Sequence, residues 1–375
     1  MQQFMSRLAL SDNTQASTAE VSRRVAAGDL DWTGAVADAI ASQGGSQAWQ
    51  HEDLYLHLQR ALAKTLGIGN IQLVVRLPLV LRPDVEREKF VTRLMAVELA
   101  RHQSAEDLAR AVFEAAPDPD VSYELRACLL HELVRRPVAV EEHPALRSFA
   151  AVLAADGHPL AQLPCHLLPL EQVERDSSWF PFGPVSRVPK EPLSTPLLAR
   201  RRAADTTVTE VRDPDRAASI GTAVREWTEV SNGRVAAHVF TVQPPLDPRD
   251  FGALFGRLPL ACRSDTPELW TTTADTVLDI LRSAASSGGA YSNPLFGTYG
   301  RLAAWQSLAG LVGLSPQTPV PQIAREAEHT HWFLFDTEAD WFDAVAWDLA
   351  IAALRPGGTS GEGQEIAVLA ATDTD

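Results

Sequence analysis

The sequence predicts a protein of two parts: an α-helical N-terminal domain, followed by a small α/β domain with a mainly parallel sheet. Three observations support this. The chain of 375 residues is longer than a single core usually supports. Helical periodicity dominates up to about residue 175, and strand runs alternate with helical patterns after about residue 205. We therefore expect a helical domain at 1–175, a proline-rich linker at 176–205 and an α/β domain at 206–375.

The N-terminal part shows one helical pattern after another. In "DVEREKFVTRLMAVELARHQ", Phe90, Leu94 and Val97 recur at helical spacing and acids crowd the first turn. Similar patterns occur in "STAEVSRRVAAGD", "LDWTGAVADAIASQGG", "SAEDLARAVFEAA" and "SYELRACLLHELVRR". Short turns between them predict antiparallel helix pairs, in a bundle or an irregular solenoid. No fixed repeat length is present, so no named repeat family is indicated.

The linker, "DSSWFPFGPVSRVPKEPLSTPLLARRR", contains five prolines, which exclude a regular helix or a central strand. After it, "TTVTEVR", "DPDRAASIGTAVREWTEVSNG" and "RVAAHVFTV" have the order strand, helix, strand. Short turns join the three segments, which is typical of a βαβ unit with parallel pairing. Helices are then expected in "TPELWTTTADTVLDILRSAAS" and "GTYGRLAAWQSLAGLVG".

A second strand, helix, strand set closes the chain in "THWFLFD", "DWFDAVAWDLAIAALR" and "EIAVLAATD". The run "IAVLAA" is apolar at consecutive positions, which indicates a strand covered on both faces. We therefore predict that the strand 366–371 lies inside the sheet and parallel to 330–335. The helix 341–354 would form the crossover between them.

Composition restricts the class of partner. The chain has 33 basic and 48 acidic residues, a net charge of −15, which argues against nucleic acid. The most apolar stretch, "IQLVVRLPLVL", is interrupted by Arg76 and Pro78 and is too short to cross a bilayer. The N-terminus lacks the apolar core of a signal peptide. We expect a cytoplasmic protein that binds a small molecule or another protein, with an oligomeric state that the sequence leaves open.

The segments "WFDAVAWDLAIAALRPGG", "IAVLAATDTD" and "GGAYSNPLFGTYGRLAAWQSLAGLVG" resemble an uncharacterised family of actinobacterial proteins of unknown function. The resemblance covers the last quarter to third of the chain and implies no catalytic residue. A GC-rich source agrees with it, since only three of the 33 basic residues are lysines: Lys64, Lys89 and Lys190.

Acidic side chains follow two of the predicted strands, at Asp336 and at Asp373 and Asp375. If these strands are parallel neighbours, the three carboxylates converge at the carboxyl edge of the sheet, where α/β proteins bind ligands. Such a cluster would suit Mg²⁺, an arginine, an amine or a basic residue of a partner. Acids at strand ends are otherwise ordinary solvated turn residues.

Asp348 is a carboxylate within an apolar helical pattern, and such a group needs a partner when it is buried. Arg301 in "GTYGR" is the partner that we predict. A structural ion pair is the simpler interpretation, and a site carboxylate is the alternative.

The segment "SSGGAYSNPLFGTYGR" is rich in glycine and precedes a helix, so its backbone amides could hold an anion. It matches neither the P-loop nor the dinucleotide-binding pattern. A long connection between two helices is the simpler interpretation, and a lid or binding loop is the alternative. Its candidate binding residues are Gly288, Gly289, Tyr291, Gly297 and Gly300.

His329 and His331 would lie on one face of a strand, at a spacing that can chelate Zn²⁺, and His238 could be a third ligand. No carboxylate at a recognised spacing completes the set, so these histidines are better interpreted as surface or interface groups. No other cofactor is evident.

Two functions from different classes are considered, and the first is favoured because the glycine-rich loop, the acids and several aromatic residues fall in one domain. One is a small-molecule site, catalytic or only binding, at the carboxyl edge of the α/β domain and capped by the helical domain. Its candidate residues are Asp336, Asp348, Asp373, Asp375 and Arg301 together with the glycine-rich loop. The other is a non-enzymatic adaptor that holds another protein on its helix pairs. An enclosed pocket at the strand ends with Arg301 and these acids would favour the first function. A solvent-exposed apolar groove on the helices, with the strand ends open and filled with water, would favour the second.

Overall fold

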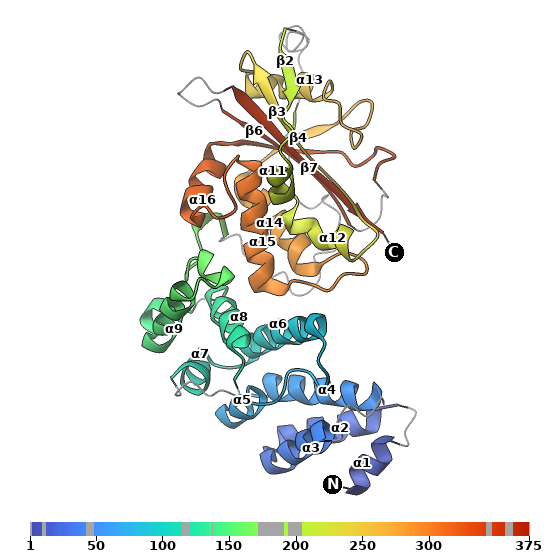
Figure 1. Ribbon diagram of the computed structural model, residues 1–375, viewed down its shortest axis with the longest axis vertical. Coiled ribbons are helices and arrows are strands. Elements are labelled where there is room, and N and C mark those ends of the chain that lie inside the picture. The colour runs from blue at the N-terminus through green and yellow to red at the C-terminus, as the bar shows by residue number, and fades with distance from the viewer. Residues whose placement is uncertain are drawn as a thin grey trace. The chain divides into compact units, whose positions relative to one another are not determined.

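The computed structural model describes residues 2–9, 13–42, 49–114, 121–136, 138–171, 191–193, 205–342, 347–356 and 363–374. The chain forms two compact units, Met1–Ala161 (unit 1) and Gln162–Asp375 (unit 2). Unit 1 is helical, as predicted, and unit 2 contains the sheet (Figure 1). Most of the predicted linker 176–205 lies outside the described residues, although Glu191–Pro192 in it forms the short strand β1.

Unit 1 is built from short and medium helices connected by turns. In chain order its elements are α1 Gln2–Ala9, α2 Gln15–Ala26, α3 Leu30–Ser42, α4 Trp49–Lys64, α5 Ile68–Val74, α6 Val85–His102, α7 Ala105–Leu108, the π-helical turn η1 Ala109–Phe113, α8 Tyr123–Val134, the 3-10 turn η2 Val140–Glu142, α9 Pro144–Ala155 and the 3-10 turn η3 Pro159–Gln162. The longest, α6, begins at Asp84, whose side chain accepts from the amide of Arg87. Glu86 and Glu88 in its first turn are stabilised by the helix dipole.

Helices α2, α4 and α6 run in the same direction, side by side. Thr14 at the start of α2 bonds Asp53 at the start of α4 at 2.5 Å, and Ser22 farther along bonds His57 at 2.8 Å. Between α4 and α6, two ion pairs show the same direction. Glu52 is paired with Arg87 at 3.6 Å near the two N-termini, and Arg60 with Glu98 at 3.0 Å near the two C-termini.

Helix α8 packs on the far side of α6 and continues this series. We call α2, α4, α6 and α8 the helix row. The returning helices α3, α5, α7 with η1, and α9 also contact one another in this order and form a second layer (Figure 1). Two continuous layers of successive helix pairs make unit 1 an irregular solenoid rather than a closed bundle.

Gln103 joins two members of the row by capping α4. Its side-chain amide donates to the carbonyls of Ala63 and Thr65, each at 2.8 Å, and its Oε1 accepts from the amide of Gly67 at 3.1 Å. The last carbonyls of a helix have no partner within that helix, so this buried side chain satisfies groups that would otherwise destabilise the end of α4. It also fixes α6 beside α4.

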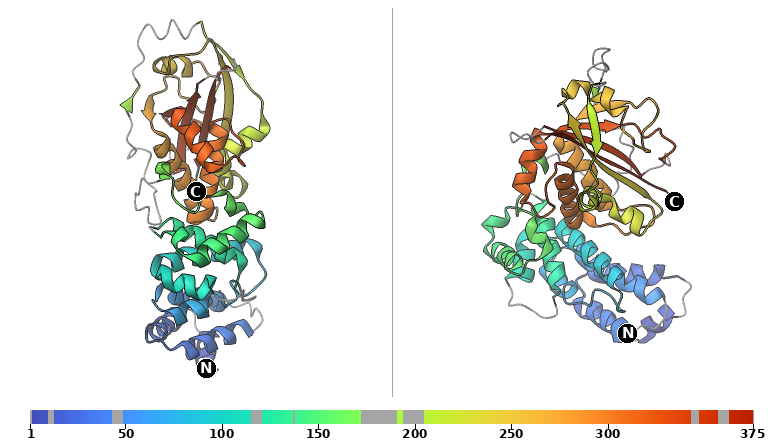
Figure 2. Two further views of the ribbon diagram at one scale, coloured as in Figure 1. Left: turned by 90° about the vertical axis from the view of Figure 1, so that its left-hand side faces the viewer. Right: turned by 45° about the horizontal axis from the view of Figure 1, so that its top comes forward.

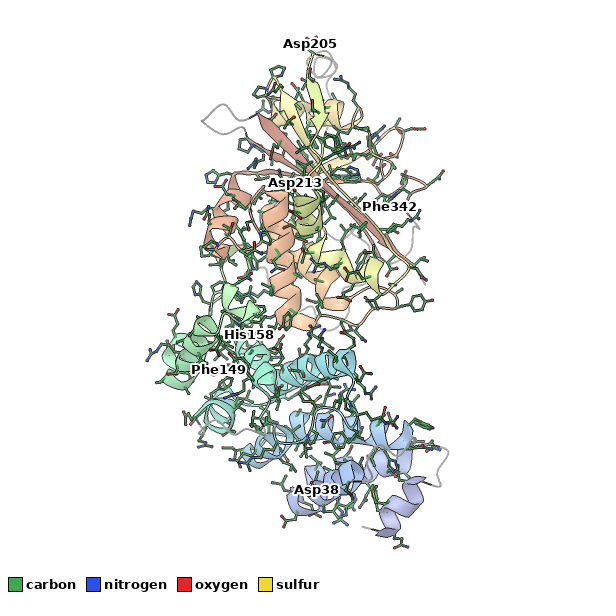
Figure 3. All side chains as sticks on the ribbon, in the orientation of Figure 1. Asp38, Phe149, His158, Asp205, Asp213 and Phe342 are labelled. Atoms are coloured by element: carbon green, nitrogen blue, oxygen red, sulfur yellow. The ribbon has the colours of Figure 1, made fainter. Side chains whose placement is uncertain are left out.

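Unit 2 places short helices around a seven-stranded sheet. Its elements are the 3-10 turn η4 Pro169–Glu171, β1, β2 Thr207–Glu210, α11 Pro214–Ile220, η6 Thr222–Val224, α12 Arg225–Glu229, β3 Arg234–Gln243, η7 Pro248–Asp250, α13 Phe251–Phe255, β4 Leu269–Thr272, α14 Ala274–Ser287, α15 Phe296–Leu311, α16 Val320–His329, β5 His331–Phe335, β6 Trp347–Arg355 and β7 Gln364–Asp373. The strand order is β1-β4-β5-β6-β7-β3-β2. Asp213, labelled in Figure 3, caps α11 by accepting from the amide of Arg216.

The predicted parallel sheet is wrong, because every strand pair is antiparallel. Strands β2 and β3 were expected to form a βαβ unit. They pair instead from Thr207 opposite Gln243 to Glu210 opposite Phe240. The first six residues of β3 therefore extend beyond the end of β2. The helices between the two strands carry the chain past that end, and the chain turns back at Gly233. The spacing of apolar residues predicts helices and strands, but it does not show whether the second strand runs parallel or antiparallel to the first.

The predicted helix 341–354 is also wrong, since Trp347–Arg355 is strand β6. Its run of alanine and leucine suits a helix by propensity. However, Leu349 to Leu354 are buried between β5 and β7 and satisfy their backbone groups in the sheet. Tertiary pairing therefore overrides the local preference. Residues 343–346 of the predicted helix lie outside the described residues.

Strand β7 lies inside the sheet, between β6 and β3, as predicted. It also runs in the same direction as β5, but only because both strands are antiparallel to β6, which lies between them. No crossover helix is involved.

Both faces of the central strands are covered. Ile366, Val368 and Ala370 of β7 face an aromatic core that includes Phe251, Phe255, Phe333 and Phe335. On the other face, helices α11, α12, α14 and α15 pack against β3, β6 and β7 (Figure 2). This double coverage explains why β6 and β7 are apolar at consecutive positions in an antiparallel sheet. In the described part of the chain, no helix is both long and apolar enough to cross a membrane.

We predict that His51 makes the stability of the protein sensitive to acid. Its side chain is 4% exposed, and neither ring nitrogen has a hydrogen-bond partner. Burial lowers the pKa of His51 below 6.5. As the pH falls below that value, the unfolded chain takes up a proton more readily than the folded chain, so the free energy of unfolding decreases.

His51→Leu removes both the titrating group and the unsatisfied nitrogens. We expect it to raise the free energy of unfolding at neutral pH by about 1 kcal/mol and to reduce the loss of stability between pH 7 and pH 5. Urea unfolding at several pH values measures both effects. The matched control is His331→Gln at an exposed position, which should behave like the wild type. An unchanged pH dependence in His51→Leu would show that His51 is not the sensitive group.

Candidate functional site

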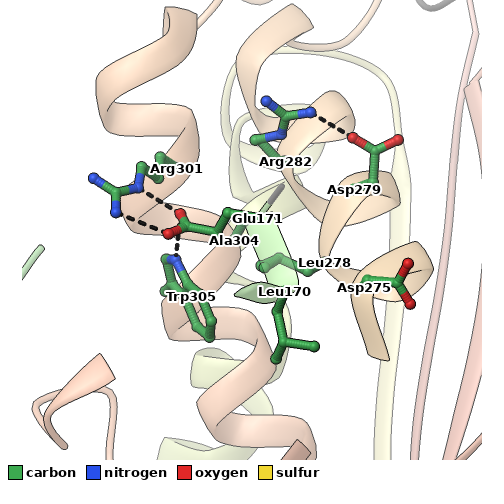
Figure 4. Close-up of a pocket in the computed structure, with 9 residues that line it drawn as sticks. All are labelled: Leu170, Glu171, Asp275, Leu278, Asp279, Arg282, Arg301, Ala304 and Trp305. Carbon is green, nitrogen blue, oxygen red and sulfur yellow. Dashed lines mark hydrogen bonds and ion pairs between the residues drawn. The ribbon is translucent and has the colours of Figure 1, made fainter. Parts of the chain in front are cut away.

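Arg301 on α15 is a deeply buried charged side chain, with 1% exposure. Its partner is Glu171 in η4. The Arg301 Nε atom donates to Glu171 Oε1 at 2.5 Å, and Nη2 donates to Oε2 at 2.9 Å (Figure 4). The remaining donors reach the carbonyls of Pro164 and His166 at 3.2 and 3.0 Å. The guanidinium therefore binds the first residues of unit 2 to α15.

Glu171 accepts hydrogen bonds from two further donors besides Arg301. The indole of Trp305 donates to Oε1 at 3.0 Å, and the amide of Leu168 donates to Oε2 at 2.9 Å. Burial alone would raise the pKa of Glu171, but the hydrogen bonds and charge of Arg301 and these two donors outweigh it, so its pKa is lowered. Glu171 therefore stays ionised, and its contribution to stability is lost only as the pH falls through this lowered pKa, below the ordinary value of 4.5.

A shallow recess lies beside this pair, between η4, α14 and α15. Its wall also includes Asp275, Asp279 and Arg282, and Asp279 accepts from Arg282 at 2.5 Å (Figure 4). The recess has a volume of about 10 Å³, which holds about one water molecule.

The predicted pair between Arg301 and Asp348 is wrong. Arg301 forms its ion pair with Glu171. Asp348 lies near the start of β6, opposite Thr372, and its Oδ1 accepts from the Thr372 hydroxyl at 2.6 Å. The apolar pattern around Asp348 belongs to a strand, so the helical face on which the pairing was predicted does not exist.

The glycine-rich segment and Asp373 do come together. Asp373 is fully buried at the end of β7, and its Oδ2 accepts from the amide of Ala290 at 2.7 Å. Its Oδ1 accepts from the hydroxyl of Ser231 at 2.9 Å and from the amide of Thr374 at 3.0 Å. The same Ser231 oxygen accepts from the amide of Tyr291 at 3.2 Å. Asp373 thus anchors the loop through its backbone.

The five glycine-loop candidates have different positions. Gly288 ends α14 with φ of 73°, a conformation that favours glycine, and Gly289 lies against Asp373. Tyr291 is 59% exposed at the surface of the loop. Gly297 and Gly300 are buried in α15, where Gly300 lets that helix approach Ser286 of α14. The segment is therefore a helix–helix connection fixed by a carboxylate.

Asp336 follows β5 and is 7% exposed. Its Oδ2 accepts from the hydroxyl of Ser264 at 2.9 Å, whereas Oδ1 is buried without a hydrogen-bond partner. Its amide continues the strand pairing by donating to the carbonyl of Glu268.

The predicted acids share an edge of the sheet but do not form one cluster. Strands β5 and β7 end where β6 begins, which brings Asp336, Asp348 and Asp373 to the same edge. Asp348 lies on the face of Ala350 and Ala352, and Asp373 lies on the opposite face, because side chains alternate along a strand. Each of the three acids has its own hydroxyl partner. Asp375 lies outside the described residues.

The histidines are also separated. His329 is the last residue of α16 and His331 the first of β5, so they do not share a strand face. His238 on β3 bonds Glu210 at 2.9 Å, and two strands separate β3 from β5. Within the described ranges, no group of three or more His, Cys, Asp or Glu side chains has a geometry that could hold a metal ion.

Glu171 and Glu98 are buried carboxylates that the sequence patterns did not single out as candidates. Glu171 follows "LPL" at the edge of the proline-rich segment, and nothing in that pattern indicates burial. Glu98 lies on the apolar side of α6 with its side chain 4% exposed, bonded by Arg60. The burial of Glu98 could have been predicted, because "MAVELARH" places this acid between apolar residues in the strongest helical pattern of the chain.

We predict that Glu171→Gln lowers the free energy of unfolding by about 3–5 kcal/mol, because it leaves the buried Arg301 charge without its counterion. The matched control is Arg282→Gln on the neighbouring helix, whose pair with Asp279 is about one-fifth exposed and should cost less than about 1 kcal/mol. Urea denaturation gives both values. Equal costs for the two variants would contradict a special role for the buried pair.

We also predict that Gly289→Ala destabilises unit 2 by about 1–3 kcal/mol. A Cβ atom at this position would lie 2.0 Å from Asp373 Oδ2, and three hydrogen bonds to the two oxygens of this carboxylate hold it in place. Gly256→Ala is the control, since the nearest atom to its Cβ is 3.8 Å away. A neutral Gly289→Ala with a normal melting temperature would show that the loop is not fixed on Asp373.

Residues 15–375 match a family of unknown function, DUF6183. The match covers nearly the whole chain rather than only the C-terminal quarter to third that the sequence resemblance indicated. No curated protein and no solved structure matches the chain. The matched residues include both the helix row and the antiparallel sheet. The chain belongs to the family of unknown function DUF6183.

Proposed function

We propose that this protein is a non-enzymatic adaptor that binds another protein on the helix row of unit 1. The observation that carries the proposal is the parallel row α2, α4, α6 and α8, which is backed by a second layer. Stacked helix pairs of this kind present a long, continuous surface, and solenoids use such surfaces to bind partners.

Exposed apolar side chains at the ends of α4 and α6 support this choice. Trp49 begins α4 and is 56% exposed, Leu66 follows α4 and is 71% exposed, and Val85 begins α6 and is 67% exposed. Large apolar side chains, tryptophan above all, contribute most of the energy in many protein interfaces. The described residues of unit 1 expose one further large apolar side chain, Val152 on α9 in the second layer.

Two of the side chains proposed for catalysis in unit 2 support the adaptor indirectly. Arg301 uses its donors to hold Glu171 and two carbonyls, and Asp373 uses both oxygens to hold a loop. A catalytic group needs an oxygen or nitrogen free to reach its substrate. These contacts are of the kind that stabilises a fold.

A small-molecule site remains the second candidate, and the recess beside Arg301 is the observation that favours it. Glu171, Asp275 and Asp279 place three carboxylates there with two arginines, a set that would attract an amine. Room for about one water molecule makes it the weaker candidate.

The low number of lysines favours an actinobacterial source, whose cells would be the natural place to test both candidates.

Site-specific photo-crosslinking of the full chain in its source cells distinguishes the two candidates. Trp49, Leu66 and Val85 are replaced one at a time by a photo-reactive amino acid, with Val152 on the second layer as the matched exposed control. We expect discrete crosslinks to the same protein from positions on the helix row and none to it from position 152. Absence of crosslinks from the row, or the same pattern from position 152, would contradict the proposal.

A further inference from the structure

A cluster of basic side chains surrounds one buried carboxylate at the C-terminal ends of α4 and α6. Glu98 has its side chain 4% exposed and lies 3.0 Å from Arg60, 3.3 Å from Lys64 and 3.4 Å from His102. Arg60 and Lys64 are one turn apart on α4, as Glu98 and His102 are on α6. Because the two helices run in the same direction, these four side chains meet at one edge of the helix row.

Positive charge exceeds negative charge at this edge. Burial lowers the pKa of His102 against the effect of Glu98, and the charges of Lys64, Arg101 and Arg136 lower it further. His102 therefore contributes no charge at neutral pH. We call Arg60, Lys64 and Arg101 the basic cluster: Arg60 and Lys64 contact the single carboxylate of Glu98, and Arg101 lies one turn after Glu98 on α6. The next acids along the chain begin α7, where Asp107 pairs with Arg110 at 2.8 Å.

Helix capping does not account for this surplus. Basic residues in a last turn are stabilised by the helix dipole, and Lys64 and Arg101 have that position. However, the end of α4 is already capped by Gln103, which donates to Ala63 and Thr65. Arg101 has no hydrogen bond or ion pair within the part of the chain that the structure describes. A net charge of −15 for the whole chain makes a local excess of cations unusual here.

An exposed apolar side chain lies next to the cluster. Leu66 follows Lys64 by two residues and is 71% exposed, the largest value among the large apolar side chains of the described residues. Its backbone is fixed, since its carbonyl accepts from the Asn70 side chain at 3.3 Å and that of Thr65 from Gln103 at 2.8 Å. A rigid apolar side chain beside several cations can bind a segment that carries both carboxylates and an apolar residue.

We propose that the basic cluster and Leu66 bind an acidic segment of a partner protein, with glutamate or aspartate side chains on the cations and an apolar side chain on Leu66. This inference rests on the proposed adaptor function and names the chemistry of its partner. Charge complementarity supports this choice, because a protein segment supplies carboxylates and an aliphatic side chain together. The net charge of −15 disfavours a nucleic acid.

The test uses a fluorescent peptide in which glutamate alternates with leucine, titrated with the full chain at low salt. We expect saturable binding that weakens as salt screens the charges. The double variant Lys64→Gln, Arg101→Gln should weaken binding about tenfold, and Leu66→Ser should weaken it by a similar factor. Both variants leave Glu98 paired with Arg60, so the fold should be retained, which the melting temperature verifies.

The matched control is Lys89→Gln at the other end of α6, where Lys89 is half exposed and paired with Glu86. It should bind the peptide like the wild type. The proposal would be overturned if the double variant bound the peptide as tightly as the wild type, or if Lys89→Gln lost as much affinity as the double variant. A failure to bind the peptide, or tighter binding of a single-stranded oligonucleotide of equal charge, would also overturn it. If photo-crosslinks from the helix row persist in the double variant, the adaptor function stands and only the acidic segment is rejected.

Discussion

The structure of unit 2 depends on covering both faces of β6 and β7. These two strands are apolar at consecutive positions, so a sheet with one solvated face would leave half of their side chains in water. The aromatic core around Phe251 and Phe333 covers one face, and α14 and α15 cover the other. This double coverage requires that the chain outside the strands be held in place, and buried polar groups do so. Arg301 and Glu171 fix the beginning of unit 2 to α15, and Asp373 fixes the α14–α15 connection.

The same requirement explains why charged residues that suggest a site are structural in this fold. A strand that ends in the interior must satisfy its last polar groups, and Asp373 does so with backbone amides and Ser231. Both carboxylate oxygens of Asp373 are occupied by these contacts. At the surface of unit 1, by contrast, Arg60 and Lys64 share the single carboxylate of Glu98.

Helix positions and most strand positions could be predicted from the sequence, but strand direction and charge partners could not. The pattern of "DVEREKFVTRLMAVELARH" located α6, and "IAVLAA" located an interior strand. The same rule that identified β7 as covered on both faces suggested parallel pairing, because such runs are typical of parallel sheets. The alanine-rich β6 and the short β4, Leu269–Thr272, were mistaken for helix because pairing across the sheet, rather than local propensity, stabilises them. The contact of the glycine-rich loop with Asp373 was partly predictable, whereas the partner of Arg301 depended on Glu171, 130 residues away.

The central claim is that the buried charges of unit 2 serve the fold and that binding takes place on the helix row. The most direct measurement compares, for one set of variants, the free energy of unfolding with the yield of the crosslinked partner. Asp373→Asn and Glu171→Gln should lower stability, and partner yield should fall only as far as the folded fraction does. Leu66→Ser should reduce partner yield while stability is unchanged. Loss of partner binding in stable, folded Asp373→Asn, with full binding by Leu66→Ser, would contradict the account.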